Sequence, residues 1–183
     1  MSHVVVAAKG MAAARHFTLP RMAELQIRPM TAAEFDAFRH RTIKDYAAEH
    51  VRAGNWSPTQ AEELAAKETD DLLSDGVDTP GMLLLAAETA DAGLIGIVWV
   101  ELQHRQTTVA WIYDIEIVPE QRGRGYGSAL LRAAEREVEK QGVKSVALNV
   151  FGGNAVARHL YESSGYEITS VFMRKTLGGG PDD

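Results

Sequence analysis

Apolar residues are spaced along the chain in two periods, one typical of strands and one typical of helices. Alternating or continuous apolar runs predict strands over residues 25–29, 82–87, 94–102, 107–118 and 145–151. Apolar residues three or four positions apart predict helices from Thr31 to the Gly54-Asn55 break, and over 57–76, 128–141 and 154–163. A last extended stretch is expected over 166–177.

The connections between these segments predict how the strands pair. Short connections join the three strands between residues 82 and 118 into an antiparallel meander. The strand, helix and strand of residues 109–151 should form a parallel crossover. We therefore expect one mixed α/β domain over residues 24–177, with a flexible N-terminal extension over 1–23 and a disordered tail over 178–183.

Composition narrows the kinds of function. The 183 residues include no cysteine, which excludes disulfides, thiolate metal sites and a cysteine nucleophile. The six histidines show no metal-ligand spacing, so we expect no metal. A net charge of −6 argues against a nucleic-acid partner. No run approaches the ~20 apolar residues of a membrane span or resembles a signal-peptide core, so we expect no membrane partner and a cytoplasmic location.

The strongest chemical signal lies between a predicted strand and a predicted helix. Glycines stand there at every second position: Gly123, Gly125 and Gly127. They let the backbone curl and leave no side chain over its amides, so the N–H groups and the helix N-terminus favour a phosphate or pyrophosphate. Arg122 and Arg124 add positive charge. A Walker loop would need Gly-Lys-Ser/Thr, which the chain lacks, and a dinucleotide-binding fingerprint would come earlier in the chain. The main alternative is therefore a simple glycine turn with solvated arginines.

This loop resembles the pyrophosphate loop of the GNAT N-acetyltransferase superfamily. The run Arg122-Gly123-Arg124-Gly125-Tyr126-Gly127 follows the family's Arg/Gln-x-x-Gly-x-Gly/Ala pattern. A second block is similar to the family's second cofactor segment, and consists of Leu148-Asn149-Val150, Asn154, Ala157, Leu160-Tyr161-Glu162 and Gly165-Tyr166. The resemblance covers about residues 24–177, and the order of strands and helices agrees throughout.

The resemblance implies a fold and a co-substrate. The fold is a mixed, mostly antiparallel sheet with a central parallel crossover and helices on both faces. The co-substrate is acetyl-CoA, with its pyrophosphate on the amides of residues 122–127 and its pantetheine arm beside residues 115–118, where that strand and 145–151 splay apart. The residues implied in acetyl-CoA binding are Ile115, Ile117, Val118, Arg122, Gly123, Arg124, Gly125, Tyr126, Gly127, Ser128, Asn149 and Asn154. A plain helix N-cap is the alternative for Asn154.

Amine acetylation needs a base, because a free amine with a pKa of ~10 is mostly protonated at neutral pH. Alternation places Val109, Trp111, Tyr113, Ile115 and Ile117 on one face of their strand and two acids on the other. Glu116 is the first candidate base because it is nearest the loop, and Asp114 is the second; a salt bridge is the alternative for both. A β-bulge, which is common in this strand of the family, would change the face of the sheet to which these side chains point. Tyr161 matches the family's tyrosine that protonates the leaving thiolate, with half-buried packing as its alternative.

We therefore predict an N-acetyltransferase that moves the acetyl group of acetyl-CoA to a primary amine of a small molecule or peptide, by direct attack in a ternary complex. A catalytically idle acetyl-CoA-binding module with a regulatory or interaction role is the alternative, because it would keep the loop. A nucleotide-binding protein is disfavoured by the missing Lys-Ser/Thr. Tyr46, His50, Asn55 and Trp56 are candidates for the acceptor site, with packing as the plainer interpretation. The acceptor and a homodimer stay open.

Overall fold

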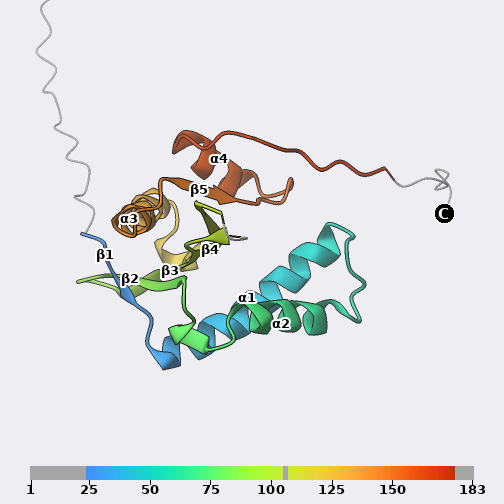
Figure 1. The fold of residues 1–183 in the computed structure, drawn as a ribbon, viewed down its shortest axis with the longest axis horizontal. Coiled ribbons are helices and arrows are strands. Elements are labelled where there is room, and N and C mark those ends of the chain that lie inside the picture. Colours follow the sequence, from blue (N-terminus) through green and yellow to red (C-terminus); the bar gives the residue numbers. More distant parts are fainter. Residues whose placement is uncertain (1–23, 105–106, 176–183) are drawn as a thin grey trace, which may run out of the picture.

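One mixed sheet organises the computed structural model, which describes residues 24–104 and 107–175 (Figure 1). Its elements in chain order are β1 (Gln26–Pro29), α1 (Ala32–Arg52), α2 (Ala61–Leu72), η1 (Gly76–Asp78), β2 (Met82–Thr89), β3 (Gly93–Glu101), β4 (Val109–Ile117), η3 (Pro119–Gln121), α3 (Tyr126–Lys140), β5 (Ser145–Leu148) and α4 (Ala155–Ser163). The expected extension 1–23 and tail 178–183 lie outside the described residues.

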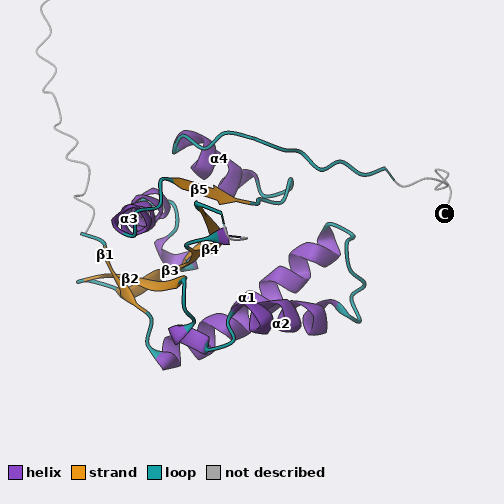
Figure 2. Cartoon of the chain, viewed as in Figure 1, coloured by secondary structure: helices purple, strands orange, loops and turns teal. Residues whose placement is uncertain are grey.

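The sheet has five strands in the order β1-β2-β3-β4-β5. The first three pairings are antiparallel, and β4 and β5 pair in parallel through the connecting helix α3. The antiparallel meander and the parallel crossover are therefore confirmed, and Figure 2 shows α3 and the α1–α2 pair on opposite sides of the strands.

Alternate side chains of the central strands feed two cores, one on each face of the sheet. Val98 of β3 is buried in a cluster with Leu130 and Leu131 of α3. The next residue, Trp99, is buried on the other face, and its ring meets Phe38 of α1 edge-on at a centroid distance of 5.9 Å. Helices thus cover both faces, as predicted, and burial of these apolar side chains stabilises the layers.

The start of α1 is set by a capping box, because the Thr31 side chain accepts a hydrogen bond from the Glu34 N–H and the Glu34 carboxylate accepts one from the Thr31 N–H at 2.8 Å. Arg28 adds two donors to the same carboxylate, each at 2.8 Å. These contacts fix the rotation of α1, which carries two of the polar side chains of the site described below.

Several predicted boundaries differ from the structure. Residues 57–60 form a turn before α2 begins at Ala61, and α2 ends at Leu72 rather than at Gly76. Helix α3 begins two residues earlier than predicted, because Gly125 at its N-cap takes a left-handed backbone with φ of 81°. Strand β5 ends at Leu148, which is where its pairing with β4 also ends.

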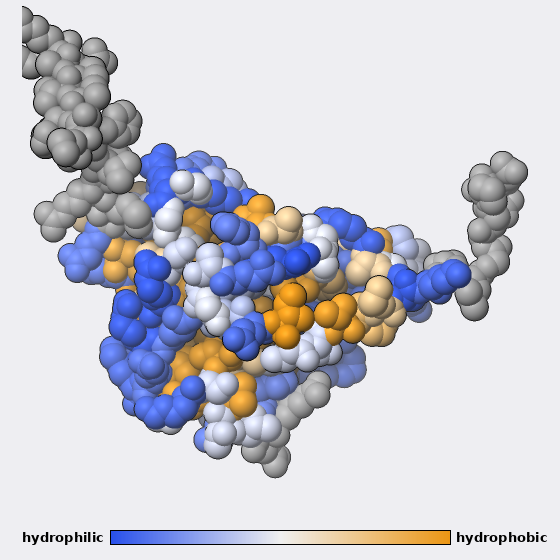
Figure 3. All heavy atoms as spheres, turned by 90° about the horizontal axis from the view of Figure 1, so that it is seen from above, coloured by the Kyte–Doolittle hydropathy of each residue, from blue (hydrophilic) through white to orange (hydrophobic). Residues whose placement is uncertain are grey.

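The predicted last strand is wrong for residues 166–175, which form no regular strand; residues 176 and 177 lie outside the described part. Arg174 instead donates a hydrogen bond to the Gly54 carbonyl at 2.8 Å, which ties the segment to the end of α1 rather than to the sheet. Exposed apolar side chains follow the segment, namely Ile168, Val171, Phe172 and Met173. Figure 3 shows orange, apolar atoms along the surface that leads to the grey C-terminal end.

A bulge shifts the facing of β4. The register with β3 pairs Asp114 with Trp99 but Ile112 with Val100, so β4 carries one extra residue at that point. Tyr113 consequently packs in the cluster on the α1 side, whereas Ile112 is buried with Ile117 on the α3 side. The prediction that Tyr113 shares a face with Ile117 was therefore wrong, and the bulge is the reason.

Candidate active site

The parallel pairing of β4 and β5 ends before the glycine loop, and we call the stretch of β4 beyond it the β4–β5 gap. The parallel ladder pairs Val109–Ile112 with Ser145–Leu148 and stops there. Strand β4 continues to Ile117, so residues 114–117 run on without a β5 partner among the described residues. This unpaired stretch offers a strand edge to an extended ligand, and the splay of the two strands stays a prediction.

The glycine loop ends in a helix N-terminus that has no side-chain cap. Gly123 and Gly125 have φ of 73° and 81°, values that favour glycine over other residues. Gly125 is the N-cap of the 15-residue α3, and the first turn of α3 carries no acid. The first N–H groups of a helix lack intrahelical acceptors, so those of Tyr126, Gly127 and Ser128 are available to an anion.

Arg122 is folded back over its own loop. Its Nε donates to the Ile117 carbonyl oxygen at 2.8 Å, and its Nη2 donates to Glu116 Oε1 at 3.0 Å. The Arg122 side chain is still 57% exposed, so the guanidinium is held in place while part of it faces solvent.

The far wall of the gap is the segment after β5. Asn149 follows Leu148 directly and is exposed. Asn154 caps α4, since its Oδ1 accepts a hydrogen bond from the Ala157 N–H at 3.1 Å. The N-cap interpretation of Asn154 is confirmed, and this bond leaves the NH₂ of the side chain unused.

Asp114 lies in the bulged part of β4, facing α1. Thr42 of α1 donates a hydrogen bond to Asp114 Oδ2 at 3.1 Å. Burial raises the pKa of Asp114 to about 6, and the charge of Glu116 acts in the same direction, against the lowering effect of the Thr42 hydrogen bond. A carboxylate of this pKa is ionised at neutral pH and is a better base than an ordinary aspartate.

Tyr161 of α4 (Ala155–Ser163) is the aromatic hydroxyl whose pKa shift includes a contribution from the charge of Asp114. Burial raises the pKa of Tyr161 to about 12, and the charge of Asp114 contributes to the shift. The Tyr161 hydroxyl has no hydrogen-bond partner within residues 24–104 and 107–175. The charge of Asp114 therefore acts on Tyr161, and the described residues leave the tyrosine proton available.

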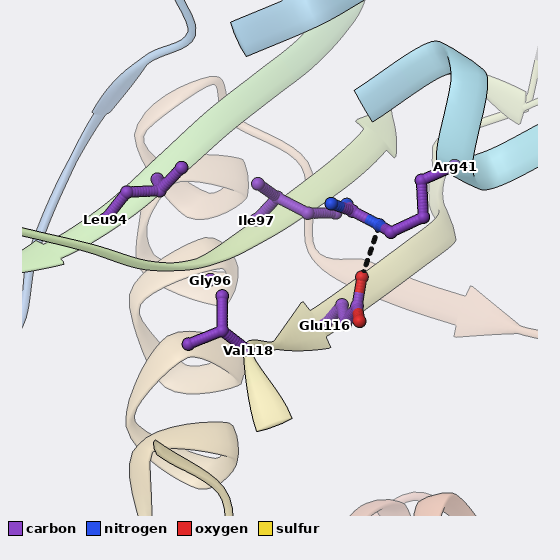
Figure 4. Close-up of a pocket in the computed structure, with 6 residues that line it drawn as sticks. All are labelled: Arg41, Leu94, Gly96, Ile97, Glu116 and Val118. Atoms are coloured by element: carbon purple, nitrogen blue, oxygen red, sulfur yellow. Dashed lines mark ion pairs between the residues drawn. The ribbon is translucent and has the colours of Figure 1, made fainter. Parts of the chain in front are cut away.

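Glu116 is held between two arginines. Its Oε2 lies 2.6 Å from Arg41 Nε, and its Oε1 accepts the 3.0 Å bond from Arg122. Figure 4 shows Arg41 reaching from α1 to Glu116 across a small cavity of about 20 Å³. The salt-bridge alternative for Glu116 is what the structure contains.

Two residues near Glu116 were missed by the sequence interpretation. Arg41 follows Phe38 by three positions, so a charge within the apolar stripe of α1 was the available signal. A Cβ at Gly96 of β3 would lie 2.5 Å from the Glu116 carbonyl oxygen. A glycine between Ile95 and Ile97 was the corresponding signal of a close backbone approach.

The candidate acceptor residues form an aromatic group at the α1–α2 joint. His50 stacks on Trp56 at a centroid distance of 3.8 Å, and Tyr46 meets Trp56 edge-on at 5.4 Å. Tyr46 and Trp56 pack against buried Ala61 and other residues of α1 and α2, in line with the packing interpretation. His50 also contacts Phe151, from the segment after β5, at 5.4 Å, so the group bridges the α1 end and the far wall of the gap.

Metal and membrane features can be assessed for the described ranges. Within residues 24–104 and 107–175, no group of three histidine, aspartate or glutamate side chains is arranged to hold a metal ion. In the same ranges no helix combines the length and the apolar character that crossing a membrane requires.

Comparison with known proteins identifies the family of this chain. The model of the Acetyltransferase (GNAT) family matches residues 33–166. The N-acetyltransferase YycN of Bacillus subtilis is 35% identical over 155 residues, which are 84% of this chain and 99% of that protein. The crystal structure of YycN superposes with a TM-score of 0.81 at 32% identity, covering 85% of this chain and 100% of the other.

Two more distant relatives differ in what they share. The mycothiol acetyltransferase of Kytococcus sedentarius is 29% identical over 147 residues, or 80% of this chain and 47% of that protein, so the chain spans about half its length. The PaiA N-acetyltransferase of Thermoplasma acidophilum, solved with coenzyme A, has a TM-score of 0.61 at 21% identity over 81% of this chain and 93% of the other. The second likeness shows the fold alone.

Proposed function

The chain belongs to the GNAT acetyltransferase family and is an acyltransferase, and on this premise we propose that it transfers the acetyl group of acetyl-CoA to a primary amine of a small molecule or peptide. The observation that carries the proposal is the edge of β4 that β5 leaves unpaired after Ile112, which includes Asp114 and is followed in the chain by the glycine loop and the α3 N-terminus without a side-chain cap. A thioester with a long arm and a pyrophosphate fits both features.

The described residues fit acetyl-CoA at both ends of this path. The backbone of Gly123, Gly125 and Tyr126 offers N–H groups to the pyrophosphate, and Arg122 adds charge from the side. The free edge of β4 at Ile115 and at Ile117–Val118 offers backbone partners to the pantetheine arm, with Asn149 and Asn154 on the other side. Gly127 and Ser128 complete the helix N-terminus, and Arg124 lies in the loop. When bound, acetyl-CoA supplies the activated acyl carbon and a thiolate leaving group.

We propose Asp114, rather than Glu116, as the base. An acceptor amine arrives protonated and must lose a proton before or during attack. Asp114 has a raised pKa and a single hydrogen bond from Thr42, whereas both Glu116 oxygens are held by guanidinium groups. The amine then attacks the thioester directly, because the chain has no cysteine to form an acyl-enzyme.

Tyr161 is proposed as the acid for the leaving thiolate. Its raised pKa keeps the hydroxyl protonated at neutral pH, and its burial beside the gap keeps competing water away. A cationic acceptor is supported by the charge near the site, because Asp45 and Glu116 both act on Asp114. Glu68 of α2, which accepts a hydrogen bond from the Tyr46 hydroxyl of α1 at 3.0 Å, adds a further negative charge.

Two measurements test the function. Calorimetry should detect binding of CoA and acetyl-CoA, and much weaker binding of ATP and NAD; equal or tighter nucleotide binding would contradict the site. A thiol-release screen with acetyl-CoA should then find an acceptor among polyamines, amino acids, aminoglycosides or peptides. CoA binding without thiol release to any amine would favour the idle acetyl-CoA-binding module.

A further inference from the structure

Three charged side chains from separate parts of the fold meet at the end of β4. Arg41 comes from α1, Glu116 from β4 and Arg122 from the glycine loop, and Glu116 uses one oxygen for each arginine. Their formal charges sum to one positive charge. The Arg41 Nε and Nη2 atoms are buried and make no hydrogen bond of good geometry to any described residue, so Arg41 is held chiefly by its charge.

We infer that Arg41 is a positioning residue that neutralises Glu116, so that Glu116 can hold Arg122 at the glycine loop without placing an unbalanced negative charge beside the phosphates or beside Asp114. The inference rests on the proposed function, because it assigns a role in CoA binding and in base strength. An arginine already held by a carbonyl and a carboxylate loses less side-chain freedom when it binds an anion. A carboxylate in that position would repel the same anion unless a second cation balanced it.

The groups that face Asp114 from the elements around it decide how Arg41 acts on the base. Thr42 of α1 contacts Asp114 directly, and the charges of Arg41 and Asp45 of α1 and of Glu116 of β4 act on it. Asp114 in turn acts on Tyr161 of α4. Arg41 is the cation among the groups that shift the pKa of Asp114. Removal of Arg41 therefore leaves Glu116 and Asp45 to raise that pKa further.

The first experiment removes the charge of Arg41 in the full chain. Arg41→Met should weaken CoA binding by about threefold to tenfold and move the acidic limb of kcat/KM upward by about half a pH unit. Arg41→Lys should keep the limb near its wild-type position. Arg39→Met is the matched control, because Arg39 lies on the same helix but pairs with Asp70 at 2.7 Å, away from the site.

A second pair of variants keeps the test decisive if Arg41→Met folds poorly. Glu116→Gln makes the net charge of the three positions more positive, so the acidic limb of the kcat/KM profile should move to lower pH. The double variant Arg41→Met with Glu116→Gln returns this net charge to its wild-type value. The double variant should therefore have a CoA affinity close to that of the wild type, and its acidic limb should lie at nearly the same pH. The inference would be overturned if the double variant bound CoA more weakly than either single variant. It would also be overturned if Arg41→Met and Arg39→Met had the same CoA affinity and the same acidic limb. Wild-type protein that binds no CoA would instead refute the proposed function.

Discussion

The hydroxyl of Thr42 donates a hydrogen bond across 3.1 Å to the carboxylate of Asp114, from a position 72 residues away in the chain. The bond joins α1 to the bulge of β4 and fixes the orientation of one carboxylate oxygen. It also lowers the pKa of Asp114, in opposition to burial and to the charge of Glu116. Thr42 therefore orients the proposed base and limits how far its pKa rises.

Replacement of this donor should be visible in the pH profile. Thr42→Val keeps the shape of the side chain and removes the hydrogen bond, so the pKa of Asp114 should rise by about 0.5–1 unit. The acidic limb of kcat/KM, expected near pH 6 in the wild type, should move upward by that amount. Thr69→Val, at another buried threonine, is the control. If the acidic limb of kcat/KM lay at the same pH in Thr42→Val and Thr69→Val, Thr42 would have no role in setting the pKa of the base.

Asp114→Asn should separate activity from stability. The pKa of Asp114 is about 6 in the folded chain against 3.8 for an ordinary aspartate, so the folded state binds the proton more tightly. Between about pH 4 and pH 6 the unfolded state ionises first, and the wild type loses stability as the pH rises. Asn removes this loss, so the variant should be more stable than wild type at pH 7.5, by up to roughly 3 kcal/mol, with no gain below pH 4.

Catalysis should respond in the opposite direction. The Asn side chain cannot take a proton, so kcat/KM should fall by about 10²–10⁴ near neutral pH, with partial recovery at high pH where the amine is neutral. Denaturant unfolding and a pH–rate series on the same samples supply both measurements. An Asn variant with wild-type kinetics would return the role of base to Glu116 or to water.

Tyr161→Phe tests the proton donor. The ring would stay packed near Tyr166, from which it lies 5.6 Å between centroids, and only the hydroxyl would be lost. The kcat should fall by about 10²–10⁴ with little change in CoA affinity. Tyr166→Phe is a useful comparison, because the Tyr166 hydroxyl donates to Glu135 at 3.1 Å rather than pointing to a free site. Equal kcat values for the two variants would assign Tyr161 to packing.

Gly125→Ala tests the loop. A side chain at φ of 81° strains the backbone by about 1–2 kcal/mol, and its Cβ would stand next to the α3 amides proposed to bind the pyrophosphate. CoA binding should weaken by at least tenfold in calorimetry. Gly142→Ala introduces the same strain at the other end of α3, also at φ of 81°, without touching the loop. Similar CoA affinity in both variants would mean that backbone strain alone explains the effect.

Local patterns were sufficient to predict most of the helices and strands and the glycine turn before α3. The Thr31–Glu34 cap, the α3 stripe and the glycine spacing depend on residues close in sequence, where periodicity and turn chemistry decide the outcome. The predicted last strand was wrong: residues 166–175 form no strand, and Arg174 contacts the Gly54 carbonyl beside the end of α1, 120 positions away. No local pattern in residues 166–175 indicates such a partner.

The choice between the two acids was beyond the sequence for the same reason. Asp114 and Glu116 stand two positions apart, and each is compatible with a role as base. Their difference comes from adjacent residues of α1, since Thr42 meets the first and Arg41 the second. That pairing depends on the rotation of α1 and on the β4 bulge, which only the packed structure defines.

The early end of the β4–β5 ladder at Ile112 also affects how readily the protein is degraded in a cell. Four residue pairs join β5 to β4, and the rest of that edge of β4 is unpaired among the described residues, so local opening there should be easy. A ligand that fills the gap at a hundred times its Kd would add about 2.7 kcal/mol to stability. We therefore expect proteolytic turnover to quicken when acetyl-CoA is scarce, so that enzyme abundance follows the supply of its own acyl donor.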